Sequence, residues 1–213
     1  MMGPTSGWET TKTVSLWVQP LGTSPVCAPA SVCDAIFGDR PRWWGISRGV
    51  VSGNDRLWVW NYDGNEDGIG IPYTIGEWVH ITLVHGGGVL RAYKNGVEVG
   101  NTPSGATEQP STGGLPVLQI GSVITGQNWS FEGQIDEVNI WNIARTPAEI
   151  LQDLYHIYTG AETGLVAYYR MSDGSGTSLT DNSSASWTGT LFDGNSTVGN
   201  GPLWVASGAF DGQ

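Results

Sequence analysis

The stretch WVHITLVHGGGVLRAYKNGVEV (residues 78–99) decides the fold class of this chain. Apolar and polar residues alternate over 78–84 and again over 89–94, as they do in strands with one buried face. A run of three glycines separates these two segments, and Asn95-Gly96 follows the second. Asn-Gly between alternating segments is a strong hairpin signal, because both central residues of the turn must accept positive φ. The stretch therefore predicts an antiparallel β-meander.

Short segments with the same alternation recur on both sides of the meander, separated by turns rich in Gly, Ser, Asp and Pro. The sequence Thr146-Pro147-Ala148-Glu149 combines a capping threonine, a first-turn proline and a glutamate at the third helical position, and it predicts one short helix near 146–158. The predicted fold class is all-β, an antiparallel two-sheet β-sandwich of jelly-roll type. No linker divides the chain, so we expect a single domain over residues 1–213. The further strands expected are 13–20, 43–47, 56–60, 117–121, 131–141, 165–171, 188–192 and 202–210.

The composition limits the classes of partner. There are 20 Asp and Glu against 9 Lys and Arg, for a net charge of −11, which would repel a phosphate backbone and excludes nucleic acid as a partner. No apolar run approaches the length of a membrane span, so we expect no membrane insertion. An acidic surface suits a secreted or cell-surface protein that holds divalent cations, although solubility alone gives the same sign. The first residues resemble no export signal, and we expect any such signal to have been removed or to belong to a larger parent protein.

Cys27 and Cys33 lie close together in a loop rich in Pro, Ser and Ala. Such a loop can bend back to bring two Cα atoms within bridging range, so a local disulfide is one interpretation. A pair of free thiols in a reducing compartment is the other.

Three segments together resemble the laminin-G-like domains that share the concanavalin A sandwich. They are residues 13–20, similar to an early core strand of those domains; residues 76–96, similar to their central hairpins; and residues 133–142 with the following 145–150. The last segment is the most specific, and it also resembles the corresponding strand and helix of pentraxins. The resemblance covers most of the chain and implies a concanavalin A-like jelly roll.

The order of the ends departs from the usual layout of that family. Stretches similar to residues 164–171 and 180–184 commonly open such domains and lead to a strand similar to 208–212, whereas here they close the chain. The domain is therefore expected to be circularly permuted, or cut from a tandem array whose units borrow strands from each other. If a strand is missing, the exposed edge could pair with another copy and form a homo-oligomer.

Asp136 is a candidate calcium ligand. It lies between Ile135 and Val138 on a long apolar strand, where a buried carboxylate needs a cation or several hydrogen-bond donors. The resemblance implies a structural Ca²⁺ there, with Asp211 and Gly212 as partners, because hard oxygen ligands suit this ion. The alternative is an aspartate that accepts hydrogen bonds from turn amides.

A second calcium candidate is the loop that contains Asp63, Asn65 and Asp67, which has the D-x-N-x-D-G start of a calcium-binding loop. Its twelfth position is Thr74 instead of glutamate, and no helices are expected to flank it. Asp, Asn and Gly are also the ordinary residues of turns.

The chain contains 11 tryptophans. Trp17, Trp78 and Trp141 lie within apolar strand patterns, and we expect them to be packing residues. Trp43, Trp44, Trp58 and Trp60 flank polar, Gly-rich loops instead. Trp58 and Trp60 are two residues apart, so they should share one sheet face. Flat rings beside polar groups can stack on sugars, whereas a protein contact or a cover over the core is the alternative. The predicted ligand-binding residues are Trp43, Trp44, Trp58, Trp60, Arg42 and Asn61, with Asp39, Arg40 and Arg48 as further hydrogen-bonding groups.

Catalysis is not expected. The hydrolases that share this sandwich place acids in a Glu-x-Asp-x-x-Glu pattern on one strand, and that pattern is absent from the sequence. Asp136 and Glu137 are adjacent, so they should point to opposite faces of a regular strand. We therefore expect a calcium-stabilised, non-catalytic binding module of a secreted or cell-surface protein, with a carbohydrate or an extracellular protein as ligand. The alternative is a structural or adhesive repeat that assembles by strand exchange without binding sugar, and a glycan-cleaving enzyme is disfavoured.

Overall fold

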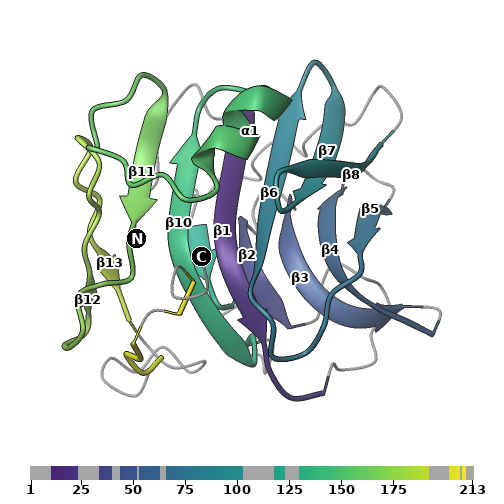
Figure 1. The fold of residues 1–213 in the computed structure, drawn as a ribbon, viewed down its shortest axis with the longest axis horizontal. Coiled ribbons are helices and arrows are strands. Elements are labelled where there is room, and N and C mark those ends of the chain that lie inside the picture. Colours follow the sequence, from purple (N-terminus) through teal and green to yellow (C-terminus); the bar gives the residue numbers. More distant parts are fainter. Residues whose placement is uncertain are drawn as a thin grey trace.

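The computed structural model is a sandwich of two antiparallel sheets (Figure 1). It describes residues 11–23, 34–39, 44–51, 53–62, 66–102, 118–122, 130–191, 202–206 and 208–209. One sheet has the order β11-β10-β1-β6-β7-β8 and the other the order β5-β4-β3-β2-β9, while β12 and β13 form a separate hairpin. The strands are β1 (Lys12–Pro20), β2 (Ala35–Asp39), β3 (Trp44–Val51), β4 (Asn54–Tyr62), β5 (Glu66–Ile71), β6 (Val79–Gly86), β7 (Val89–Lys94), β8 (Val97–Asn101), β9 (Leu118–Ile120), β10 (Gly133–Trp141), β11 (Leu165–Tyr169), β12 (Ser178–Leu179) and β13 (Gly189–Thr190).

The space between the two sheets is filled by one apolar cluster. Alternate residues of β1 supply Val14, Leu16 and Val18 to it, and β4 contributes Leu57 and Val59 from the opposite sheet. Burial of such side chains is the main stabilising term of a sandwich, at roughly 25 cal/mol per Å² of apolar surface removed from water. The predicted two-sheet β-sandwich is confirmed.

The meander of residues 78–99 is also confirmed. Strands β6, β7 and β8 pair in sequence order, and Asn95 and Gly96 have φ values of 47° and 79°, as the Asn-Gly turn requires. Strand β8 is an edge of the six-stranded sheet, with Val97 64% exposed.

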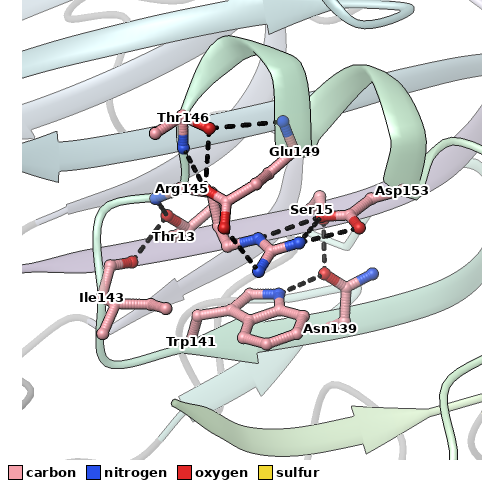
Figure 2. A network of polar contacts seen from close by, with 9 residues as sticks. All are labelled: Thr13, Ser15, Asn139, Trp141, Ile143, Arg145, Thr146, Glu149 and Asp153. Atoms are coloured by element: carbon pink, nitrogen blue, oxygen red, sulfur yellow. Dashed lines mark hydrogen bonds and ion pairs between the residues drawn. The ribbon is translucent and has the colours of Figure 1, made fainter. Parts of the chain in front are cut away.

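The helix α1 (Pro147–Asp153) lies across the outer face of the six-stranded sheet, over β1 and β6 (Figure 1). Its N-terminus has the predicted capping box, in which Thr146 and Glu149 bond reciprocally. Arg145 fixes the helix to the sheet, because its guanidinium bonds Asp153 at 2.6 Å and lies 4.2 Å from the centre of the Trp141 ring (Figure 2). Below it, the Asn139 side chain accepts hydrogen bonds from Ser15 and Trp141.

The helix is shorter than predicted, since it ends at Asp153 and not near residue 158. The carbonyl of Leu154 accepts a hydrogen bond from the Trp17 indole at 3.1 Å, so it is used to attach the chain to the sheet. The next residues then pack outside a helix, with Tyr155 against the Trp17 ring and Tyr158 against Trp141. Tertiary contacts of aromatic side chains therefore end the helix early.

The C-terminal part of the chain adds a strand to the same sandwich. Strand β11 pairs with β10 at the edge of the six-stranded sheet. The strand expected over 202–210 is not formed, because residues 202–206 and 208–209 lie outside every sheet. Instead, Trp204 packs on the main core and donates from its indole to the carbonyl of Gly176 at 3.0 Å.

Candidate functional site

The outer face of the five-stranded sheet is the candidate site. In β4, Leu57 and Val59 point into the core, so the alternate residues Arg56, Trp58 and Trp60 point outward. The other outer face of the sandwich, by contrast, is covered by α1 and the segment after it (Figure 1). The predicted placement of Trp58 and Trp60 on one sheet face follows from this alternation.

Glycines surround these two tryptophans. Trp60 pairs with Gly45 of β3 on one side and with Gly68 of β5 on the other. Trp58 pairs with Ser47 and Gly70 in the same two strands. Cross-strand partners point to the same face, so small residues flank both rings. On the β3 side Gly45 and Ser47 are buried, whereas on the β5 side Gly68 is exposed and Gly70 is half-buried.

The Trp58 ring reaches from β3 to β5. Its indole donates to the carbonyl of Gly49 in β3 at 3.0 Å, and its six-membered ring lies over β5. A Cβ added to Gly70 would stand 3.0 and 3.1 Å from the Cζ3 and Cη2 atoms of that ring. The side chain is half-buried, so part of the ring is open to solvent.

Arg56 follows on the same face, two residues before Trp58. Its Nη1 donates to the backbone carbonyl of Asp55 at 2.7 Å. Within the described part of the chain, no carboxylate forms an ion pair with it. The face therefore combines an aromatic ring with a cation whose charge is not neutralised by those residues.

The other predicted ligand-binding residues lie elsewhere. Trp44 and Asn61 form a cross-strand pair on the inner face and are buried, with Trp44 in the main core. Trp60 lies on the outer face but is only 3% exposed, so little of its ring is accessible. Arg48 points inward and is buried in an ion pair with Asp34. Trp43, Arg40 and Arg42 lie outside the described residues, as do Cys27 and Cys33; Asp39 is in β2, with its side chain undescribed.

A β-bulge in β10 determines how the two candidate acids lie. Ser15 pairs with Asn139 and Trp17 with Asp136, so two residues of β10 oppose one residue of β1. Glu137 is the extra residue, with a φ of 50° in the left-handed region. Because Ile135 and Val138 both pack on the main core, Asp136 and Glu137 lie together on the outer side. The prediction that these two acids face opposite sides is wrong.

Glu137 is held in a buried polar cluster. It accepts a hydrogen bond from the Tyr168 hydroxyl, and Arg170 lies 3.7 Å from its other oxygen. Burial raises the pKa of Glu137, the Tyr168 bond opposes this, and the charge of Asp136 raises the pKa further. Asp136 is 3% exposed and accepts from the Glu137 amide at 3.0 Å.

The other expected calcium ligands are not placed by the described part of the chain. Asp63, Asn65, Asp211 and Gly212 lie outside it, while Asp67 is in β5, paired with Asn61, with its side chain undescribed. Among the described residues, no group of three or more His, Cys, Asp or Glu side chains could hold a metal ion. In the described part of the chain, no helix is long and apolar enough to cross a membrane.

Sequence reasoning missed Arg56, Gly68 and Gly70 as members of the face. The signal is the alternation in EDGIGI, residues 66–71, where the positions that alternate with the two isoleucines, Gly68 and Gly70, are glycines instead of polar residues. Next to the two tryptophans of the preceding strand, this pattern indicates a strand without side chains on its outer face at Gly68 and Gly70.

The two antiparallel sheets define a β-sandwich module. The chain belongs to the concanavalin A-like lectin/glucanases superfamily, whose laminin G model matches residues 4–151, more than half of the chain. The resemblance seen in the sequence is thereby confirmed.

Individual relatives are similar over different parts of the chain. A proposed carbohydrate-binding protein of Bacteroides ovatus superposes with a TM-score of 0.69 at 20% identity, over 88% of this chain and 53% of that one. A SAP-like pentraxin of Limulus polyphemus gives a TM-score of 0.53 at 20% identity, over 70% of this chain and 72% of that one. Mouse pappalysin-1 is 32% identical over 84 residues, which are 38% of this chain and 5% of that protein. The two structural similarities show the fold alone, and the chain matches only a small part of pappalysin-1.

Proposed function

We propose that this chain is a non-catalytic carbohydrate-binding module, with its site on the outer face of the five-stranded sheet. The observation that carries the proposal is the half-buried Trp58 ring, whose six-membered ring reaches over Gly70 with the Arg56 side chain beside it. Flat aromatic rings next to a few polar groups are suited to the apolar faces of sugar rings. Membership of a superfamily named for lectins and glucanases, and the fold of the proposed carbohydrate-binding protein, are in keeping with this function.

We propose that the module is non-catalytic because the carboxyl groups of Asp136 and Glu137 are buried. Glycoside hydrolysis needs two carboxyl groups that reach the bond to be broken. Asp136 and Glu137 are the carboxyl pair that the bulge brings together, but they are 3% and 7% exposed. Tyr168 also occupies one oxygen of Glu137. A sugar could not reach this pair without displacing the surrounding side chains.

Trp58→Ala should weaken glycan binding at least about tenfold, because losing an aromatic ring costs about 1.4 kcal/mol or more at a binding hot spot. Binding is measured by calorimetry and by tryptophan fluorescence across a panel of neutral and acidic oligosaccharides. Trp204→Ala is the matched control, since Trp204 is also half-buried and donates to a glycine carbonyl at 3.0 Å. Equal affinity of the wild-type and Trp58→Ala proteins for every bound glycan would reject this site, and no binding to any glycan would reject the function.

We also propose that Ca²⁺ stabilises the module at Asp136, with Asp211 and Gly212 as the expected partners. The supporting observation is that the bulge holds the Asp136 and Glu137 carboxyl groups on one side of the sheet, where a divalent cation would offset their repulsion. Oxygen atoms from carboxylates and backbone carbonyls are the ligands that this ion prefers. The loop of Asp63, Asn65 and Asp67 is kept as a second, independent site.

We expect Ca²⁺ at about 100 times its dissociation constant to stabilise the fold by roughly 2.7 kcal/mol relative to chelator-treated protein. For a dissociation constant on the order of 20 μM, this concentration is about 2 mM. Thermal unfolding measures this effect. Asp136→Asn should remove it, whereas the double variant Asp63→Asn/Asp67→Asn tests the loop by the stoichiometry of bound calcium. An unchanged unfolding midpoint in wild-type protein with and without Ca²⁺ would contradict the metal site.

The alternative function, strand exchange between copies, is favoured by one observation, the exposed Val97 and Val99 on edge strand β8. A net charge of −11 on each copy opposes that association, so we place saccharide binding first. We propose a secreted or cell-surface location, where such a module would meet a polysaccharide or an extracellular protein.

A further inference from the structure

We infer that the ligand of this face is an acidic saccharide, with its carboxylate or sulfate group on Arg56. The inference rests on the proposed function, because it specifies the chemical class that the Trp58 site selects. It depends on three features of the face: the charge of Arg56, its spacing from Trp58, and the bare backbone at Gly68.

The first feature is the charge of Arg56. In a chain with 20 acidic and 9 basic residues, most described arginines are paired with carboxylates. Arg48 pairs with Asp34, Arg145 with Asp153, and Arg170 with Glu137. Arg56 bonds only to a backbone carbonyl among the described groups. A guanidinium in this state keeps donors that fit a carboxylate or sulfate in a bidentate geometry.

The second feature is the spacing between the charge and the ring. Arg56 and Trp58 are alternate residues of β4, so their Cα atoms are separated by about 6.8 Å along the strand. Gly70 of the neighbouring strand lies between the two side chains, because a Cβ there would be 3.0 Å from Trp58 Cζ3 and 3.3 Å from Arg56 Cγ. A sugar ring stacked on Trp58 thus brings an acidic substituent within reach of Arg56.

The third feature is Gly68, next to both tryptophans. Its φ lies outside the left-handed region, and a Cβ there would meet Trp58 Cε3 at 3.5 Å and Trp60 Cβ at 4.0 Å, which are ordinary contacts. The fold would therefore accept alanine at this position. Gly45 differs, since a Cβ there would lie 2.3 Å from the carbonyl oxygen of Phe37. The open space at Gly68 is thus not required by packing, and it leaves room for a ligand beside the Trp58 ring.

The test compares matched saccharides by calorimetry. Four uronate oligosaccharides and two sulfated ones are each measured beside the carboxyl-reduced or desulfated form, at low and high salt. Wild-type protein should bind at least one acidic member about tenfold more tightly than its neutral form, and salt should reduce the preference. Arg56→Gln should abolish the preference without moving the unfolding midpoint. Arg91→Gln, a change on β7 of the other sheet, should leave the preference intact and controls for net charge.

Gly68→Ala supplies a second variant that keeps the fold. Its unfolding midpoint should be equal to or slightly above that of wild type, because alanine costs less backbone entropy than glycine in a strand. Its affinity for the acidic saccharide should fall at least about fivefold. The acidic inference would be overturned if wild-type protein bound each acidic saccharide and its neutral form with equal affinity. It would also be overturned if Arg91→Gln lost the preference as Arg56→Gln does. Either result would leave saccharide binding itself unchallenged. No binding to any member would overturn both.

Discussion

Arg48→Met is expected to lower the free energy of unfolding by about 3–5 kcal/mol, because it leaves the Asp34 carboxylate buried without its cation. Arg48 is fully buried and its guanidinium bonds Asp34, while Nη1 donates to the carbonyl of Leu21 at 2.5 Å. Asp34 in turn accepts from the Glu132 amide at 3.3 Å. The pair thus joins strands of the five-stranded sheet to segments next to β1 and β10 of the other sheet. Denaturant unfolding measures the loss.

The pH dependence of the same variant identifies the cause. Burial raises the pKa of Asp34 even though the charge of Arg48 lowers it, so removal of Arg48 should raise this pKa further. A carboxyl group whose pKa is raised by folding lowers stability as the pH rises through its folded-state pKa. Arg48→Met should therefore be less destabilising at acidic pH than at pH 7. Asp34→Asn/Arg48→Met should recover much of the loss, and a loss that neither acid nor this second change reduces would assign the effect to packing.

The strands with regular alternation could be predicted from the sequence, and those without it could not. Strands β1, β6 and β7 each have a buried face whose apolar residues repeat every second position, so their pattern is visible in one segment. Strand β5 has glycines at alternate positions, and its sequence resembles a turn when it is read alone. Pairing with the tryptophan strand β4 is what makes it a strand.

The candidate site could be predicted only in part. The i, i+2 spacing places Trp58 and Trp60 on one face, but periodicity does not tell which face is the core. The bulge at Glu137 was also hidden, because it depends on the register with β1 across more than a hundred residues of sequence. Likewise, arginine is usually a surface residue, and only the ion pair with Asp34 explains why Arg48 is buried between the sheets.

Asp181→Ala should be the other large loss of stability, on the order of 3 kcal/mol, since the Asp181 side chain satisfies several buried donors at once. Its carboxylate accepts from the amides of Tyr168, Ser183 and Trp187 at 2.7–2.9 Å, and from the Ser183 hydroxyl. Each buried donor left without an acceptor costs about 1–3 kcal/mol.

The amide of Tyr168 belongs to edge strand β11, so loss of this acceptor should open β11 before the rest of the sheet. Hydrogen exchange at that amide, together with denaturant unfolding, measures both effects. Asp173→Ala is the matched control, because Asp173 accepts from the Thr180 amide at 3.2 Å in an exposed turn where water can replace it, and it should cost about 0.5 kcal/mol or less. Asp181→Asn keeps an acceptor oxygen and should fall between the two. Equal losses for Asp181→Ala and Asp173→Ala would show that the turn, and not the buried carboxylate, secures the strand.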